Sequence, residues 1–242
     1  MCRLKSGLIL KNRVFVPEYD NHTDMLEELG IEDNYLNASK TFVRVELSPS
    51  NGDVFSDIDT WELNVDQDIT PEWYDEDTYK PQVVDAVKAW AKDHIHIDVD
   101  DLKISTGRNH YIKNCKAVNI YDSATVENIC GSATVKYIYG SATVKYICGS
   151  ATVKYIYGSA TVKYICDSAT VKYICDSATV KYIYDSATVK NAKGLSVVIG
   201  SRYGWDKKDT LILSENATFK DCQTKTIYQS GDWKLVDVKE EK

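Results

Sequence analysis

The chain has 242 residues, seven cysteines and a formal net charge of −7. This length leaves room for a modest domain on each side of a repeat, and the hydrophobic fraction of 43% is below the usual value for globular proteins. No stretch approaches the roughly 18 apolar residues of a membrane-spanning helix, and the first residues lack the apolar core of a secretory signal. The sequence therefore predicts a cytoplasmic protein with reduced thiols and without a membrane partner.

Charge is distributed unevenly along the chain. Residues 1–110 carry 11 basic and 23 acidic side chains, residues 111–193 carry 10 and 5, and residues 194–242 carry 8 and 8. An acidic N-terminal part and a basic middle part are the main electrostatic features. A net charge of +5 over residues 111–193 is small for a dedicated nucleic-acid-binding domain.

The N-terminal part predicts a small α+β domain over residues 1–110. Alternating apolar residues indicate strands, and Thr23 or Asp24 is a plausible cap for a short helix that ends at Gly30. Pro81 is placed to open a longer amphipathic helix that ends near His94. The expected elements, in order, are strands 7–10 and 13–16, a helix 25–29, strands 41–47 and 61–65, and a helix 81–94.

Eight nonapeptides follow one another without a gap from Tyr121 to Ala192. Position 1 is Tyr or Cys, position 2 is Asp or Gly, and positions 3 to 6 are always Ser-Ala-Thr-Val. The Asp or Gly indicates a turn, and the residues after it favour a strand. We expect Ala, Val and Ile to point inward and Thr and Lys outward. Residues 111–193 therefore predict a β-solenoid within a mainly β protein.

An 18-residue coil made of two nonapeptides is expected, because one nonapeptide is too short to enclose an interior. Position 1 supports this length, since Tyr and Cys alternate from Tyr121 to Cys166 before Cys175 and Tyr184 break the order. Stacked coils would then place the cysteines on one corner and the tyrosines on the other. A history of duplicated pairs of nonapeptides explains the same alternation, and a three-sided coil of three nonapeptides is the main structural alternative.

The C-terminal part, residues 194–242, predicts a β-rich cap. Solenoids need atypical ends, because an open core and unpaired edge strands would otherwise be exposed. Ser230-Gly231 indicates a turn between the last two expected strands. The expected strands are 195–199, 210–213, 217–219, 226–228 and 233–236.

Three segments resemble an uncharacterised module of bacterial and bacteriophage proteins. They are residues 5–31, the segment WELNVDQDITPEW at 61–73 and the helix VKAWAKDHI at 87–95. Proteins of that family carry DSATV-type repeats in varying number, followed by an ending similar to TIYQSGDWKLV at 226–236. The resemblance covers nearly the whole chain. It implies a phage or prophage context in a bacterial cell, and it implies no catalytic residues.

One short segment has the residue types of a metal site. His94, His96 and Asp98 would share one face of a strand, and His-x-His-x-Asp is found in metal hydrolases. The segment lacks a second His or Cys cluster, and His94 at a helix end is an ordinary partner of the helix dipole. We expect no metal, no cofactor and no enzymatic activity, and we keep these three residues as ligands for the alternative of a metal-dependent enzyme.

The repeat predicts a surface of equal sites rather than a catalytic centre, which needs unlike groups at one point. We expect a structural or interaction protein whose repeat acts as a spacer or a repeated binding surface for an unidentified protein, with self-association through the solenoid as a further option. The alternative is an anionic polymer, nucleic acid or a cell-envelope polymer, held by a lysine and tyrosine ladder. The ladder residues are Lys136, Lys145, Lys154, Lys163, Lys172, Lys181, Lys190, Tyr139 and Tyr157.

Overall fold

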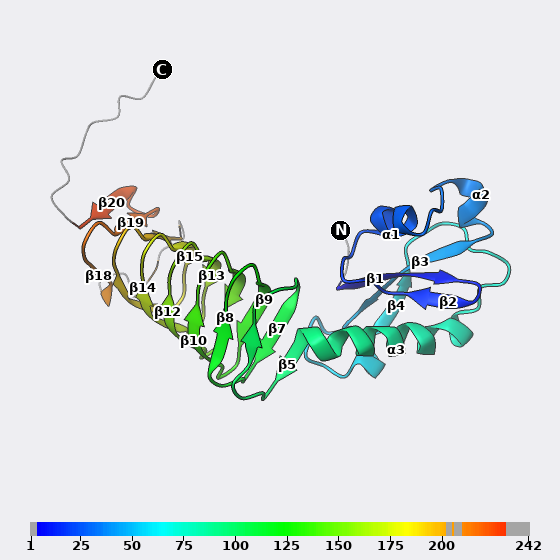
Figure 1. Ribbon diagram of the computed structural model, residues 1–242, viewed down its shortest axis with the longest axis horizontal. Helices are drawn as coiled ribbons and strands as arrows, with labels where there is room; N and C mark the ends of the chain where they lie inside the picture. The colour runs from blue at the N-terminus through cyan, green and yellow to red at the C-terminus, as the bar shows by residue number, and fades with distance from the viewer. Residues whose placement is uncertain (1–3, 202–204, 206–209, 231–242) are drawn as a thin grey trace, which may run out of the picture. The chain divides into compact units, whose positions relative to one another are not determined.

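The computed structural model describes residues 4–201, 205 and 210–230. The chain forms two compact units, residues 1–95 and residues 96–242, which we call the N-terminal unit and the solenoid unit (Figure 1). The prediction of a mainly β fold with a solenoid of 18-residue coils is confirmed, and the solenoid makes about seven turns.

The N-terminal unit is built on a four-stranded antiparallel sheet with the order β2-β1-β3-β4. One face packs against α1 through the buried side chains of Leu8, Met25, Leu26 and Phe42. The longer helix α3 lies on the other face (Figure 1). The elements are β1 (Lys5–Leu10), β2 (Arg13–Phe15), α1 (His22–Glu28), α2 (Tyr35–Ala38), β3 (Phe42–Ser48), η1 (Ile58–Thr60), β4 (Glu62–Val65) and α3 (Glu76–His94).

Two helix starts differ from the sequence-based expectation. Helix α1 is capped by Asn21, whose side chain accepts the Thr23 N–H, so neither Thr23 nor Asp24 is the cap. Helix α3 begins at Glu76 rather than at Pro81, because Asp75 accepts the Thr78 N–H and two acidic residues occupy the first turn. Pro81 then lies inside the helix, where it forfeits one backbone hydrogen bond.

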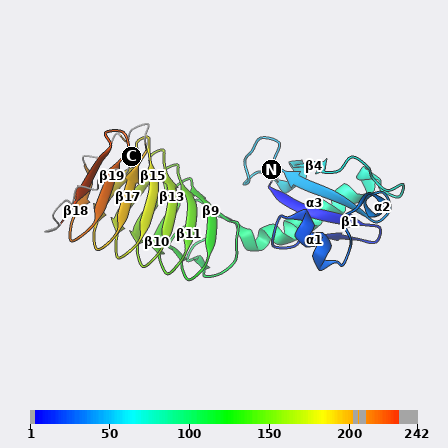
Figure 2. The same cartoon turned by 90° about the horizontal axis from the view of Figure 1, so that it is seen from above.

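The solenoid unit consists of two parallel sheets, of seven and nine strands, that close around one core (Figure 2). Each strand pairs with the strand two nonapeptides later, as in Thr134 with Thr152 and Val135 with Val153, so a three-sided coil is excluded. The seven-stranded sheet contains β6 (Lys103–Ile104), β8 (Val118–Ile120), β10 (Thr134–Ile138), β12 (Thr152–Ile156), β14 (Thr170–Ile174), β16 (Thr188–Ala192) and β18 (Ile212–Leu213). The nine-stranded sheet contains β5 (Ile95–Ile97), β7 (His110–Lys113), β9 (Thr125–Cys130), β11 (Thr143–Ile147), β13 (Thr161–Ile165), β15 (Thr179–Ile183), β17 (Val197–Gly200), β19 (Thr218–Asp221) and β20 (Thr226–Gln229).

The core of the solenoid is formed by positions 4, 6 and 9 of each nonapeptide. Ala151, Val153 and Ile156, for example, are completely buried, and their equivalents in the other repeats are buried to the same degree within two per cent. Since positions 6 and 9 both point inward, positions 7 and 8 both point outward. Each strand therefore presents a Lys and a Tyr side by side to the surface instead of alternating strictly.

The turns explain why position 2 is limited to Asp and Gly. Both residue types adopt a left-handed backbone there, with φ 64° at Gly149 and 54° at Asp167. A Cβ on Gly149 would lie 3.0 Å from the Gly131 nitrogen one coil earlier, so a side chain there needs a small local shift, which the next coil makes for Asp167. The Asp167 carboxylate in turn accepts the Gly149 N–H at 2.8 Å and so links two coils.

The solenoid extends beyond the repeat at both ends. Strands β5 and β6 precede residue 111, so the solenoid starts inside the segment that the sequence assigned to the N-terminal domain. After the repeat, β17, β18 and β19 continue the two parallel sheets, and only β20 turns back to pair antiparallel with β19. Trp205 is buried at this end and donates to the Ala187 carbonyl oxygen at 2.7 Å. The expected strand 233–236 lies outside the described residues.

Candidate functional site

The seven lysines of the predicted ladder form two columns, one on each sheet of the solenoid. Lys145, Lys163 and Lys181 follow one another on β11, β13 and β15 of the nine-stranded sheet, and the other four lie on the seven-stranded sheet. All are exposed except Lys145, which is half-buried. The four on the seven-stranded sheet are Lys136, Lys154, Lys172 and Lys190.

Few ladder lysines have an acidic partner. Lys145 donates to Glu127 at 2.8 Å, and this hydrogen bond raises the pKa of its ammonium group. Lys136 lies 3.6 Å from Asp101. The remaining five have no ion pair within the part of the chain that the structure describes. Two of these five ammonium groups lie 5.1–5.2 Å from the ring centre of the adjacent tyrosine, Lys154 over Tyr155 and Lys163 over Tyr164. The columns therefore present positive charge that the protein itself leaves mostly uncompensated.

A tyrosine column accompanies each lysine column. On the nine-stranded sheet, Tyr146 stacks on Tyr164 at 4.8 Å between ring centres, and Tyr164 stacks on Tyr182 at 5.3 Å. On the seven-stranded sheet the corresponding stack is Tyr137, Tyr155 and Tyr173, with separations of 5.8 and 5.0 Å. These six tyrosines occupy position 8 of the nonapeptide. The ladder predicted from the sequence did not include them. The signal that could have found them is the separation of the inward-pointing Val and Ile, which stand three residues apart at positions 6 and 9 and leave positions 7 and 8 facing outward.

The predicted tyrosines at position 1 form a separate column on one corner. Tyr139 stacks on Tyr121 at 5.3 Å and on Tyr157 at 5.1 Å. Tyr157 also meets the edge of Tyr137, so this corner and the seven-stranded sheet form one continuous aromatic surface. Within each column of three, the middle ring is stacked on both faces and each end ring on one face. The surface thus offers ring edges, hydroxyl groups and ammonium groups, which suit a partner that accepts hydrogen bonds better than one that inserts bases between rings.

The opposite corner carries the cysteine column of Cys130, Cys148 and Cys166, which are free thiols. A hydrogen bond with Cys130, together with burial, raises the pKa of the Cys148 thiol to about 11. A hydrogen bond with Cys148 and burial raise the pKa of Cys166 as well. Tyr184 follows Cys166 in this column, as the broken alternation in the sequence predicts. Neutral thiols are poor nucleophiles and poor metal ligands, so this corner is a structural part of the coil.

The structure does not bring the three predicted metal ligands together. Both ring nitrogens of His94 have partners within the N-terminal unit: Nε2 lies 2.7 Å from Glu18, and Nδ1 lies 2.8 Å from the Trp90 carbonyl oxygen. His96 instead contacts His110, and the two rings are stacked. Asp98 occupies a left-handed turn position. Among the described residues, the group that meets the distance requirements of a metal site is a different one.

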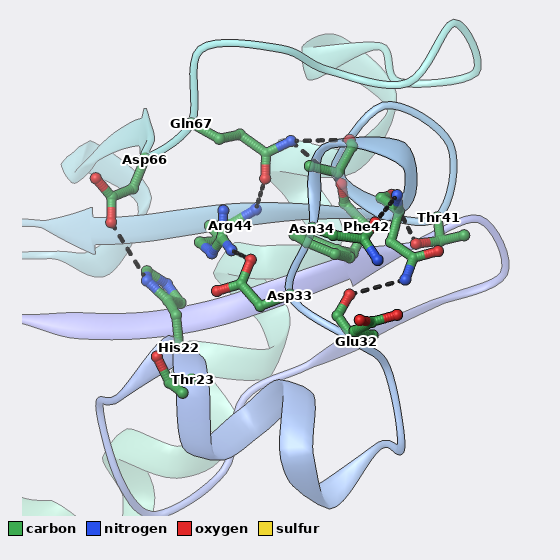
Figure 3. A network of polar contacts seen from close by, with 12 residues as sticks. His22, Thr23, Glu32, Asp33, Asn34, Thr41, Phe42, Arg44, Asp66 and Gln67 are labelled. Atoms are coloured by element: carbon green, nitrogen blue, oxygen red, sulfur yellow. Dashed lines mark hydrogen bonds and ion pairs between the residues drawn. The ribbon is translucent and has the colours of Figure 1, made fainter.

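That group lies on the α1 face of the N-terminal sheet and consists of His22, Glu46 and Asp66. Figure 3 shows His22 and Asp66 beside a network in which Arg44 forms an ion pair with Asp33. Gln67 completes the network, because its side-chain oxygen accepts the Arg44 N–H at 2.9 Å. The three residues come from α1, β3 and the end of β4, so only the tertiary fold places them together.

Comparison with known proteins adds no assignment to these sites. No family model, no curated protein and no solved structure matches the chain. Within the described residues, no helix has the length and apolar character needed to cross a bilayer.

Proposed function

We propose that this is a non-enzymatic interaction protein, of phage or prophage origin, whose solenoid presents a repeated surface to a partner. The observation that supports the proposal is the regular succession of Lys and Tyr on both sheets. Each coil adds one strand, with one Lys and one Tyr, to each sheet, in register with the strand before it. A column of equal sites gains affinity through repeated weak contacts, as repeat proteins do on their extended surfaces. The N-terminal unit then engages a second partner.

The test uses affinity capture from bacterial lysate with three full-length baits. One is unaltered, one lacks residues 157–174, which is one complete coil, and one carries Gln in place of Lys145, Lys163 and Lys181. A protein partner whose yield falls in both altered baits supports the repeated surface. Equal yields from all three baits would show that the solenoid is a spacer and that binding belongs to the N-terminal unit.

A second candidate function is binding of an anionic polymer, and the five ladder lysines without an ion pair among the described residues favour it. Binding of a labelled single-stranded oligonucleotide or of a sulfated polysaccharide should then weaken steeply with salt. Replacing the three lysines of the nine-stranded sheet with Gln should reduce the slope of log affinity against log salt by about two. Binding that is insensitive to salt between about 50 and 200 mM would contradict this candidate function.

A further inference from the structure

Three polar side chains converge on the α1 face of the N-terminal sheet. His22 is the first residue of α1, Glu46 lies on β3, and Asp66 directly follows β4. One potential ligand atom from each lies within 4.8 Å of the other two. The Asp66 N–H donates to the Arg44 carbonyl oxygen at 2.9 Å, which extends the β3–β4 pairing and holds Asp66 beside the other two residues. We propose that these residues bind one divalent transition-metal ion.

The orientation of the His22 ring leaves one nitrogen for an ion. Nε2 lies 3.2 Å from the Val45 carbonyl oxygen, which can only accept a hydrogen bond, so Nε2 carries a proton. Nδ1 lies 3.3 Å from the Asp66 carboxylate, which also accepts only. Two acceptors at this distance require a cation between Nδ1 and the Asp66 carboxylate, and this cation is either a second proton on the ring or a metal ion. Metal-bound histidines typically donate their other N–H to a backbone carbonyl in this way.

The surroundings of Glu46 favour the metal ion over the proton. The residue is only 7% exposed, and no hydrogen bond or ion pair of its carboxylate is found among the described residues, so the little solvent contact that remains is the carboxylate's only polar contact there. A buried carboxylate without a partner is strongly unfavourable. Ser6, its neighbour across the β1–β3 ladder, is fully buried, and its hydroxyl group also has no partner within the described part of the chain. One proton on His22 compensates one carboxylate, whereas a divalent ion compensates both and supplies the missing partner for Glu46.

The ligand types indicate the class of ion. One imidazole nitrogen with two carboxylates suits Mn²⁺, Fe²⁺, Co²⁺ or Zn²⁺, whereas Mg²⁺ and Ca²⁺ prefer oxygen ligands alone. The Asp66 side chain is 59% exposed, so solvent reaches the site from its side. An ion can enter there, and water can complete its coordination. The N-terminal unit thereby gains a site that is independent of the solenoid surface.

The test is a titration of the full-length protein with MnCl₂ after treatment with EDTA and dialysis. Mn²⁺ is the first probe because it has little affinity for the free thiols of the solenoid unit. Calorimetry, or the electron paramagnetic resonance signal of free Mn²⁺, should show one saturable site per chain. Glu46→Gln and Asp66→Asn should each weaken binding at least ~10-fold. Asp68→Asn, an exposed acid of the same loop, should leave the affinity unchanged.

Thermal melting gives a readout that a purely structural role of Glu46 would not produce. Without metal, Glu46→Gln should melt above the unaltered protein, since an unpaired buried charge has been removed. With saturating Mn²⁺ the order should reverse, because only the unaltered protein binds the ion. Asp66→Asn changes an exposed side chain and keeps the test valid if Glu46→Gln does not fold.

Three results would each overturn the assignment. One is the absence of saturable binding of Mn²⁺ and of Zn²⁺ at millimolar concentration. The second is equal affinity in the unaltered protein and in Asp66→Asn. The third is an equal loss of affinity in Asp68→Asn, which would show that the loop attracts cations only through its general charge.

Discussion

At the level of single residues, position 1 of the nonapeptide determines what each corner of the coil contains. Tyrosines there stack ring on ring, while Cys130, Cys148 and Cys166 form a chain of sulfur contacts that ends at Tyr184. Both columns repeat an uncharged group at the same point of each coil. Charged side chains succeed one another at position 7, where lysine reaches into solvent, and at position 2, where the Asp185 carboxylate accepts the Asp167 N–H of the preceding coil.

The cysteine column should make the protein less stable at alkaline pH. The pKa of Cys148 is raised in the folded protein, and the pKa of Cys166 is raised too, so both thiols stay protonated while those of the unfolded chain ionise from about pH 8.5. The unfolded state then binds fewer protons than the folded state, and the free energy of unfolding falls as pH rises above that value. The loss should be on the order of 1 kcal/mol per thiol by pH 10, after allowance for solvent screening.

Urea denaturation at pH 7, 8, 9 and 10 measures this effect. Replacing Cys148 or Cys166 with Ala should flatten the decline, whereas Cys222→Ala, at an exposed position, should leave it unchanged. A decline that is as steep in Cys148→Ala as in the unaltered protein would assign the alkaline instability to other groups.

At the level of elements, the coil of two nonapeptides is the unit in which the solenoid can be shortened. Deleting residues 157–174 removes one strand from each sheet and keeps every following strand in its own sheet. Deleting residues 157–165 removes one strand only, so β17, β18 and β19 would each have to join the other sheet. Trp205 would then no longer lie beside the Ala187 carbonyl oxygen, to which its indole N–H donates.

We therefore expect unequal stability of the two deletion variants. The shorter deletion should cost about 3 kcal/mol more in unfolding free energy than the longer one, which is the scale of losing one buried aromatic residue. Thermal melts followed by circular dichroism would show the difference, and the unaltered protein is the reference for both variants. Equal melting temperatures would indicate that the C-terminal strands seat equally well on either sheet.

The repeat itself was predictable from the sequence because every layer of it obeys the same local rules. A turn residue at position 2 and apolar residues at positions 4, 6 and 9 suffice to define a coil of two nonapeptides. The part of the solenoid before residue 111 was not predicted, since its inward positions require only apolar side chains such as Ile104, without the SATV pattern. The start of α3 was missed because the cap at Asp75 outweighs the cost of Pro81 within the helix.

The two candidate sites also differ in whether the sequence predicts them. The lysine columns follow from the period, because equivalent residues of every second nonapeptide must stack in such a coil. His22, Glu46 and Asp66 lie far apart in the sequence and share no motif, so only the pairing of β1, β3 and β4 brings them together. A sequence pattern detects a site when its spacing is local or periodic, and this group is neither.

At the level of the whole molecule, two units of opposite charge are joined in one chain. Residues 1–95 carry 9 basic and 20 acidic side chains, and residues 96–242 carry 20 and 16. Their cores are also of different kinds: the N-terminal sheet is antiparallel and covered by helices, whereas the solenoid core is a regular stack of Ala, Val and Ile. Each unit thus has the means to fold on its own core.

Unfolding should therefore proceed in two separate transitions. In a Trp205→Phe, Trp233→Phe variant, the remaining Trp61, Trp73 and Trp90 report on the N-terminal unit by fluorescence, while far-ultraviolet circular dichroism is dominated by the strands of the solenoid. In urea the two signals should have different midpoints, because the stabilities of independent units have no reason to coincide. Deleting residues 157–174 should move only the circular dichroism midpoint, and Glu46→Gln only the fluorescence midpoint. Coincident midpoints that shift together in both variants would show instead that the two units unfold as one cooperative structure.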